Sequence, residues 1–291
     1  MRTTSHWITL FVAVALFGGP CALAQDVEKK KAYVQGYDVL ALPGEEVALR
    51  AKAERGNRLA LRPDIEGATL EFYGGGKLLG SAKTDDDGIA AITRKYEKPW
   101  RHFVTVKFGA KSKYRANEAA LLVDVCDAKT RFIVCDIDHT IADVSATKFV
   151  FKKNENVPAL PGSPEALARL SIHYNIIYVT ARDDAFLRKT KDWLALRKFP
   201  HGPVFFWDFL GKEPSHEKYK TREIADLKKR FPNIVAGVGD KVSDANAYLA
   251  NGLNAIIIGP ERDDGLPAKA IWVKTWAEIE KLLKAPDALE K

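Results

Sequence analysis

Short runs that alternate apolar and polar residues, separated by turn residues, fill the front part of the chain. One run ends in three consecutive glycines, and a turn of three aspartates and a glycine spans 85–88. This spacing predicts strands at 46–53, 69–73, 102–108 and 119–125, and one further strand on each side of the 85–88 turn. Such a series is typical of a small antiparallel sandwich of the immunoglobulin-like type. The region holds no serine–histidine–aspartate group and no cysteine–histidine cluster, so we interpret it as a spacer or an interaction module.

The pattern changes near residue 125, where apolar runs of strand length begin to alternate with helical stretches. We expect strands at 131–136, 175–180, 203–207, 234–238 and 255–258, and helices at 164–170, 184–197, 221–231, 244–250 and 275–283. This alternation predicts a parallel sheet wrapped by helices. Ligands of such sheets bind beyond the carboxyl ends of the strands, so the residues that follow each strand are the candidates for a functional site.

The start of the chain has the features of a secretory signal peptide. A basic residue precedes an apolar run over 7–17, and an alanine-leucine-alanine site follows at 22–24. The run is shorter than the roughly 20 residues that cross a bilayer, so cleavage is preferred to a membrane anchor. We therefore expect an exported protein, periplasmic or secreted, with no transmembrane segment in its mature chain. The predicted boundaries are 1–24 for the signal peptide, 25–125 for the β-sandwich domain and 126–291 for the α/β domain.

The composition is that of a folded protein, with 291 residues, 46% apolar and 29% charged. These proportions exclude disordered and coiled-coil classes. The net charge is +7, but the longest basic run is only 29–31, so no nucleic-acid partner is expected. The three cysteines are too few for a disulfide scaffold. Cys126 and Cys135 lie beyond the leader, where either a bridge between them or buried free thiols would fit.

Carboxylates, hydroxyls and ammonium groups follow the predicted strands of the second part. Two carboxylates only two residues apart in an apolar setting repel each other, so a cation should lie beside them. Carboxylate oxygens hold Mg²⁺, whereas hydroxyl, lysine and backbone N–H groups bind phosphate oxygens. The set therefore favours phosphoryl transfer from a phosphate monoester, with one carboxylate able to form an aspartyl-phosphate that water hydrolyses. In chain order the set is Asp136, Asp138, Thr140, Thr180, Lys218, Lys220, Asp240 and Asp244.

The order and spacing of these residues resemble the four motifs of the haloacid dehalogenase superfamily. The resemblance covers roughly residues 130–260 and implies a Rossmann-like parallel sheet with flanking helices. Taken singly, a threonine after a strand or an aspartate at a helix start is an ordinary cap, but caps do not predict this order. The corresponding segments are Asp136-x-Asp138-x-Thr140, Thr180, Lys220 and Gly239-Asp240-x-x-x-Asp244.

The resemblance also implies a role for each residue. Asp136 is the expected nucleophile, and Asp138 is the expected general acid that protonates the leaving oxygen and later activates water. Lys218 is the alternative to Lys220, and only the fold can choose between them. The residues expected to bind phosphate are Thr140, Thr180 and Lys220. The residues expected to hold Mg²⁺ are Asp136, Asp138 through its backbone carbonyl, Asp240 and Asp244, the last as a ligand or as a neighbouring acceptor.

Within the superfamily, the chain most resembles the phosphatidate phosphatases of the lipin and actin-patch type. Residues 136–141 are similar to their first motif, 217–232 to their third and 239–248 to their fourth. His139 departs from the glycine or aspartate usual at that position, which bears on substrate preference more than on reaction type.

The intervals between the motifs are too short for a large cap domain. An uncapped site is open and accepts a bulky or membrane-held phosphate ester. Residues 148–153 interleave aromatic and basic side chains. This pattern fits either a surface that contacts a membrane interface or an ordinary amphipathic strand. We therefore expect an exported Mg²⁺-dependent phosphatase acting on phosphatidate-like lipids at a membrane surface. The alternatives are a broad phosphatase of soluble monoesters and a non-catalytic protein whose front domain binds an unknown envelope partner.

Overall fold

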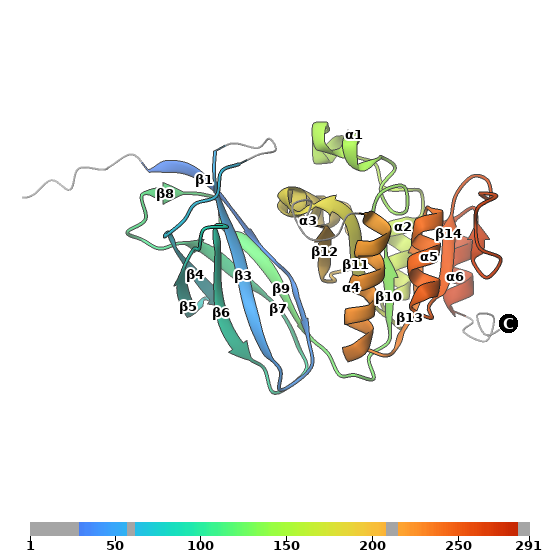
Figure 1. Ribbon diagram of the computed structural model, residues 1–291, viewed down its shortest axis with the longest axis horizontal. Helices are drawn as coiled ribbons and strands as arrows, with labels where there is room; N and C mark the ends of the chain where they lie inside the picture. Colours follow the sequence, from blue (N-terminus) through green and yellow to red (C-terminus); the bar gives the residue numbers. More distant parts are fainter. Residues whose placement is uncertain (1–28, 57–61, 208–214, 285–291) are drawn as a thin grey trace, which may run out of the picture.

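The computed structural model describes residues 29–56, 62–207 and 215–284. A front pair of β-sheets is followed, beyond residue 125, by a six-stranded sheet flanked by helices (Figure 1). The signal peptide predicted at 1–24 lies outside the described residues. Across the ranges that the structure describes, no helix is both long enough and apolar enough to span a membrane.

The strands of the front region are β1 (Lys30–Gly36), β2 (Val39–Ala41), β3 (Glu46–Arg55), β4 (Thr69–Gly74), β5 (Lys77–Lys83), β6 (Ile89–Lys95), β7 (Trp100–Phe108), β8 (Tyr114–Arg115) and β9 (Ala119–Val125). They form one sheet in the order β6-β3-β1-β8 and another in the order β2-β9-β7-β4-β5. The alternation in β3 explains the packing, because Val47 and Leu49 are buried in the shared core while their neighbours are exposed. The pairings are antiparallel except β1 with β8 and β2 with β9, and the immunoglobulin-like type stays a prediction.

The first two strands do not follow from the sequence pattern. Gln35, Gly36 and Asp38 interrupt any apolar alternation there, yet Gln35 and Asp38 are buried. Val34, by contrast, faces the core of the front region. Because neighbouring residues of a strand face opposite sides, the buried Gln35 points away from this core, toward the α/β region.

The strands of the second region are β10 (Phe132–Cys135), β11 (Asn175–Asp183), β12 (Val204–Trp207), β13 (Ile234–Gly239), β14 (Asn254–Ile258) and β15 (Ile271–Val273). They pair in parallel in the order β12-β11-β10-β13-β14-β15, which confirms the predicted parallel sheet. After β10 the chain adds strands first on one side and then on the other. The crevice at such a switch point lies beyond the carboxyl end of β10.

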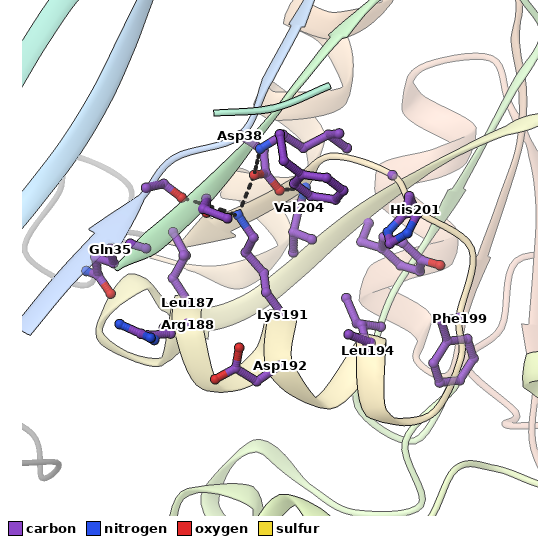
Figure 2. Close-up of a pocket in the computed structure, with 18 of the residues that line it drawn as sticks. Gln35, Asp38, Leu187, Arg188, Lys191, Asp192, Leu194, Phe199, His201 and Val204 are labelled. Carbon is purple, nitrogen blue, oxygen red and sulfur yellow. Dashed lines mark hydrogen bonds and ion pairs between the residues drawn. The ribbon is translucent and has the colours of Figure 1, made fainter. Parts of the chain in front are cut away.

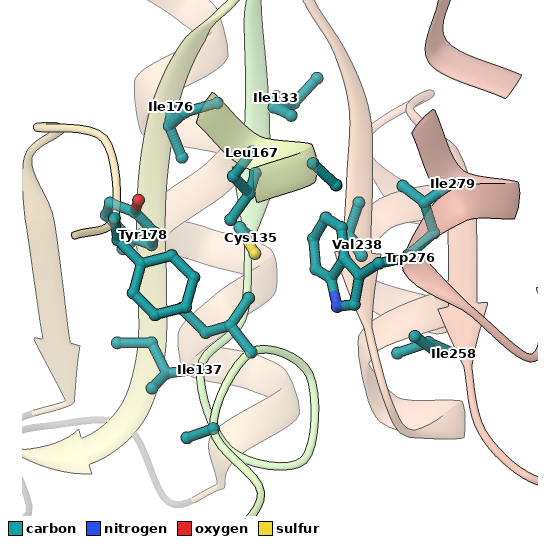
Figure 3. Packing of buried hydrophobic residues seen from close by; sticks show 14 of the residues in the cluster. Ile133, Cys135, Ile137, Leu167, Ile176, Tyr178, Val238, Ile258, Trp276 and Ile279 are labelled. Atoms are coloured by element: carbon teal, nitrogen blue, oxygen red, sulfur yellow. The ribbon is translucent and has the colours of Figure 1, made fainter. Parts of the chain in front are cut away.

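Helices cover both faces of this sheet. Ile133 and Cys135 of β10 pack with Trp276 on one face (Figure 3), whereas Phe132 and Val134 pack on the opposite face. The first face is covered by α2 and α6, and the second by α4 and α5. The helices are α1 (Ala146–Phe151), α2 (Ser163–Leu170), α3 (Leu187–Leu196), α4 (His216–Arg230), α5 (Val242–Ala250) and α6 (Trp276–Lys284), with the 3₁₀ turns η1 (Asn154–Asn156) and η2 (Asp184–Phe186).

The structure corrects some expectations and decides others left open. The segment 148–153 is not a strand, because most of it belongs to α1, which Ser145 caps by accepting the Lys148 N–H. Helix α4 begins before its predicted start, since the Ser215 side chain caps it. Cys126 and Cys135 are both buried free thiols.

Candidate active site

The carboxyl end of the parallel sheet brings the predicted aspartates together. Asp136 directly follows β10, and its N–H donates to the Val238 carbonyl of β13 at 2.9 Å. Asp240 and Asp244 follow β13, and single carboxylate oxygens of Asp136, Asp240 and Asp244 all lie within 4.8 Å of one another. Three carboxylates at this separation repel one another unless a cation balances their charge.

That cation is Lys220, whose side chain is buried on α4. Its Nζ donates to Asp136 Oδ1 at 2.6 Å and to Asp244 Oδ1 at 2.5 Å. Burial disfavours the charged ammonium, but the two carboxylates outweigh burial and raise the pKa of Lys220 above its ordinary value. Lys218 is exposed on the same helix. The geometry therefore favours Lys220 over Lys218 as the lysine of the site.

Asp244 is held from two sides. Its Oδ2 accepts the backbone N–H groups of Asp240 at 3.1 Å and Lys241 at 3.2 Å, so it also caps α5. Burial alone would raise its pKa, but Lys220 and these N–H groups lower the pKa of Asp244 below its usual value. A Cβ on Gly239 would lie 2.5 Å from the Asp244 Cβ, so only glycine allows this close approach.

Asp240 has no such partners for its side chain. Its Oδ1 is buried and accepts no hydrogen bond from any described residue. Burial, together with Asp136 and Asp244, raises the pKa of Asp240 to about 8. Burial likewise raises the pKa of Asp136 to about 6, against the opposing effect of Lys220. Clustered carboxylates with an unpartnered buried oxygen fit a divalent cation that takes oxygen ligands, such as Mg²⁺.

Asp138 belongs to a separate ion pair with Arg182. The guanidinium donates from Nε to Asp138 Oδ2 at 3.0 Å and from Nη2 to Asp138 Oδ1 at 2.9 Å. The Arg182 side chain is 1% exposed and that of Asp138 is 11% exposed, so the bidentate pair is largely shielded from solvent. Two parallel charge-assisted bonds fix the plane of the carboxylate as well as its position.

Arg182 is itself held by two buried side chains. Its Nη1 donates to Thr190 Oγ1 on α3 at 3.0 Å. Its Cζ lies 3.6 Å from the ring centroid of Phe149, which belongs to α1. These contacts leave the guanidinium little freedom, so the orientation of Asp138 depends on α1 and α3 together.

Sequence reasoning did not assign Arg182 to the site, although it predicted that a cation must balance the paired aspartates. The structure supplies one cation for each, Lys220 for Asp136 and Arg182 for Asp138. A signal was present, because Arg182 and Thr180 are two residues apart on β11 and therefore share a face.

The two threonines predicted to bind phosphate are both fully buried. Thr140 Oγ1 donates to Asp136 Oδ2 at 3.3 Å, so it orients that carboxylate. Thr180 Oγ1 accepts the Arg182 N–H at 3.2 Å. Both hydroxyls thus lie among the residues of the site, and their direct contact with phosphate stays a prediction.

His139 occupies a tight turn between the two aspartates and Thr140. Its φ of 55° lies in the left-handed region, and its N–H donates to the Ala142 carbonyl at 2.9 Å. Glycine and aspartate adopt this region more readily than most residues, and histidine is also enriched there. The left-handed turn geometry is therefore compatible with histidine at position 139.

Part of the chain matches a known family. Residues 133–258 match the family model of the LNS2 domain of PITM 1-3. Curated relatives include Membrane-associated phosphatidylinositol transfer protein 1 of Rattus norvegicus, Mus musculus and Homo sapiens, each 37% identical over 81 residues. The matched segment is 28% of this chain and 6% of each relative, so the chain spans only a small part of the length of these relatives.

Solved structures similar to the chain include proteins of two kinds. One is the D,D-heptose 1,7-bisphosphate phosphatase of B. bronchiseptica, with 21% identity, a TM-score of 0.43, and coverage of 54% of this chain and 99% of that chain. Another is a set of fibronectin(III)-like modules of Clostridium thermocellum CbhA, with 13% identity, a TM-score of 0.23, and coverage of 32% and 96%.

The family match covers the part of the chain that carries the site. The residues from Asp136 to Asp244 all lie within 133–258. Together with the parallel sheet and the clustered carboxylates, the match supports a phosphatase-type hydrolase domain with a haloacid dehalogenase-like fold.

Proposed function

We propose that the protein is an Mg²⁺-dependent phosphatase that hydrolyses phosphate monoesters through an aspartyl-phosphate. The observation that carries this proposal is the pairing of two neighbouring carboxylates with two different cations. Asp136 Oδ1 lies 2.6 Å from Lys220 Nζ, near the carboxylates of Asp240 and Asp244. Asp138 is instead bound through both oxygens by Arg182. Two carboxylates in different surroundings suit two different tasks, a nucleophile and a general acid.

Asp136, Asp240 and Asp244 would hold the metal ion, as their clustered oxygens and the unpartnered Asp240 Oδ1 suggest. When bound, Mg²⁺ would neutralise negative charge on the phosphoryl group. Lys220, already shared by two of these carboxylates, would supply further positive charge for the phosphoryl oxygens.

The protein groups account for bond making and proton transfer. The Asp136 carboxylate oxygen attacks phosphorus, and the bond from phosphorus to the ester oxygen breaks. Asp138 acts in its protonated form, with the proton on a lone-pair position that Arg182 does not use, and gives that proton to the leaving oxygen, so the alcohol departs neutral. Asp138 then takes a proton from water as the water attacks the aspartyl-phosphate, which releases inorganic phosphate and restores both carboxyl groups.

Phosphatidate-like lipids are the proposed substrate class, and a surface beside the site supports this. Phe151 at the end of α1 is 84% exposed, and the adjacent Lys148, Lys152 and Lys153 are also exposed. An exposed aromatic ring among lysines suits the boundary between anionic head groups and acyl chains. We name Phe151, Lys148, Lys152 and Lys153 the α1 tip. The curated relatives are also named as membrane-associated proteins.

The α1 tip is fixed in place next to the proposed catalytic residues. Lys189 Nζ donates to the carbonyls of Phe149, Val150 and Lys152 at 2.6, 2.9 and 2.6 Å, which closes the end of α1. Phe149 on the same helix lies against Arg182, the partner of Asp138. A membrane that contacted the tip would therefore lie near the site. Export, proposed from the signal peptide, would bring the enzyme to envelope lipids.

The test is phosphate release from phosphatidate in mixed micelles by the mature chain with Mg²⁺, compared with Asp136→Asn. Release that requires both Asp136 and Mg²⁺ is the expected result. Release from soluble monoesters but not from phosphatidate would overturn the lipid assignment and leave the phosphatase. No release from either substrate would overturn the phosphatase and favour a binding protein.

A further inference from the structure

A buried carboxylate of the front region joins it to the α/β region. The Asp38 side chain is 1% exposed. Its Oδ1 accepts the Leu122 N–H of β9 at 2.7 Å and Lys191 Nζ of α3 at 2.5 Å, and its Oδ2 accepts the Val204 N–H of β12 at 3.1 Å. Figure 2 shows Lys191 reaching from α3 toward Asp38. One side chain thus bonds a front strand, a helix and the edge strand of the parallel sheet.

Lys191 is bound almost wholly by the front region. Besides Asp38, its Nζ donates to the Ala120 carbonyl at 2.9 Å and to the Gly36 carbonyl at 3.4 Å. Its side chain is 16% exposed. Replacing either partner alone would leave the other charge buried and unpaired.

Further contacts from the front region fall on the same stretch of chain, residues 184–191. Tyr37 donates its hydroxyl proton to Asp184 Oδ2 at 2.7 Å. Arg62 Nη2 donates to the Ala185 carbonyl at 2.9 Å. Arg188 Nη1 donates to the Asn117 carbonyl at 3.2 Å. The front region therefore holds η2 and the first half of α3, which directly follow β11.

This stretch also determines where Arg182 lies. Thr190, next to Lys191 on α3, accepts a hydrogen bond from Arg182 at 3.0 Å, and Arg182 in turn clamps Asp138. Arg182 itself is near the end of β11, immediately before η2. Asp38 is thus connected to the proposed general acid by the ion pair with Lys191, by helix α3, on which Lys191 and Thr190 are neighbours, and by the hydrogen bonds of Arg182 to Thr190 and Asp138.

We infer that the front region positions the general acid, with Asp38 and Lys191 as positioning residues that hold α3, Thr190 and Arg182 in register with Asp138. The inference rests on the proposed phosphatase function for its catalytic consequence. It makes the front region part of the catalytic unit, in addition to any partner that this region binds. Loss of the Asp38–Lys191 pair should impair proton transfer to the leaving group while sparing the carboxylates beside Lys220.

The experiment compares two substrates that differ in their need for an acid. Phosphatidate releases an alkoxide, which needs a proton, whereas 4-nitrophenyl phosphate releases a stable phenolate. The variant is Asp38→Asn combined with Lys191→Met, so that no unpaired buried charge is left. The matched control is Glu45→Gln, which removes the charge of another contact of the front region, the 3.1 Å ion pair with Arg230 on α4.

We expect kcat on phosphatidate to fall about 10- to 100-fold in the double variant, less than the roughly 10²- to 10⁴-fold that a general acid contributes, because Asp138 itself is retained. On 4-nitrophenyl phosphate, kcat should change less than about threefold, and KM on both should change less than about twofold. Glu45→Gln should match the wild type. Equal loss on both substrates, or no loss on either, would overturn the inference. Thr190→Val, which removes the hydroxyl that Arg182 binds, should show the same selective loss of kcat on phosphatidate. Thr190→Ser, which keeps the hydroxyl, should retain the kcat of the wild type.

Hydrogen exchange provides a readout that does not depend on activity. Amides of residues 180–191 should exchange about tenfold faster in the double variant than in Glu45→Gln. Equal exchange in the two would overturn the inference even if the wild type hydrolysed neither ester. Inactivity of the wild type on both esters would instead overturn the proposed function, so the two failures are distinguishable.

Discussion

Asp136 and Asp138 are separated by one residue, yet their surroundings differ in kind. Asp136 shares the Lys220 ammonium with Asp244 and lies near Asp240, whose Oδ1 has no partner among the described residues. Asp138 has both oxygens occupied by Arg182. The Asp136 carboxylate lies in a ligand-binding cluster, in which Asp240 Oδ1 is free to bind a metal ion. The Asp138 carboxylate is held in one orientation.

The difference arises from the elements that supply the two cations. Lys220 extends from α4 on one face of the sheet, and its ammonium is a point charge that several oxygens can share. Arg182 lies on β11, and its planar fork binds one carboxylate in one orientation. A strand that places two neighbouring carboxylates at a sheet edge can therefore give them different tasks if their cations come from different elements.

The largest effect should come from removing the carboxylate in the ligand-binding cluster. Asp136→Asn should lower kcat at least about a thousandfold, because a carboxamide cannot form the aspartyl-phosphate. Lys220 keeps Asp244 as its partner, so the melting temperature should change little. Turnover on 4-nitrophenyl phosphate, together with a melting curve, checks both expectations. A folded variant that retains a tenth of the activity would contradict the assignment of the nucleophile.

The cation of that cluster should matter for folding as well as for activity. Lys220→Met leaves the buried Asp136 and Asp244 without a counter-charge, which should cost about 3–5 kcal/mol of stability in metal-free protein. Mg²⁺ should recover part of this loss, because it binds only the folded cluster. Chemical denaturation with and without Mg²⁺ measures both quantities. Lys218→Met, at the exposed lysine, is the matched control and should leave stability within about 0.5 kcal/mol.

The second cation should affect orientation more than charge. Arg182→Lys keeps a positive charge but loses the bidentate grip on Asp138 and the contact with Phe149. We expect kcat on phosphatidate to fall about 10- to 100-fold, with a smaller loss on 4-nitrophenyl phosphate. Steady-state kinetics on the two esters distinguishes this from a general loss of structure. A loss of the same size on both would mean that Arg182 only supports the fold.

The ligand-binding cluster should also respond to pH. The pKa of Asp240 is about 8 and that of Asp136 about 6, both above the ordinary value near 4, because the carboxyl groups are buried. The folded metal-free protein therefore binds more protons than the unfolded chain between pH 4 and 8, and its stability should fall as pH rises through that window.

Metal binding requires these protons to leave, so apparent Mg²⁺ affinity should rise about tenfold per pH unit below pH 8 for one displaced proton. Calorimetric titration at pH 6, 7 and 8 measures the affinity and the released protons. Asp240→Asn should weaken binding and flatten its dependence on pH. An affinity that stayed constant across these pH values would contradict the protonated state of the cluster.

The sequence predicts the surroundings of Asp136 better than those of Asp138. Asp136, Asp240 and Asp244 follow from ordered motifs at the ends of strands, because parallel strands end on one side of the sheet. The choice of Lys220 over Lys218 came from the fold, which of the two buries only Lys220. Arg182 was not predicted, because an arginine in a loop pattern is most often solvated, and its burial depends on Phe149, a residue far along the chain. The sharing of a face with Thr180 was the only local signal.

The same limit applies to the front region. The strands of its core follow from alternation, as Val47 and Leu49 of β3 illustrate. Strands β1 and β2 do not follow from alternation. Asp38, which lies between them, pairs with Lys191 of the α/β region instead of packing against an apolar neighbour. A polar residue that is buried by a distant partner has the local pattern of a loop residue, so only the assembled structure reveals it.

The smallest effect should come from the α1 tip, which lies outside both ion pairs. Phe151→Ala removes an exposed ring, and Lys152→Ala with Lys153→Ala removes two exposed charges, so neither change should alter folding. Each should raise the apparent KM on phosphatidate vesicles about three- to tenfold, because an interfacial ring and surface lysines each contribute on the order of 1 kcal/mol to membrane binding.

The control for the α1 tip is a large apolar side chain exposed elsewhere on the molecule. Leu78→Ala changes a residue that is 56% exposed on β5 of the front region, and it should leave vesicle kinetics unchanged. With soluble 4-nitrophenyl phosphate all these variants should equal the wild type, since the site itself is untouched. Added salt should weaken vesicle activity in Phe151→Ala but have less effect once the lysines are gone, because screening acts only on the charges. Equal losses on vesicles and on the soluble ester would show that the α1 tip supports Phe149 and Arg182 and does not contact lipid.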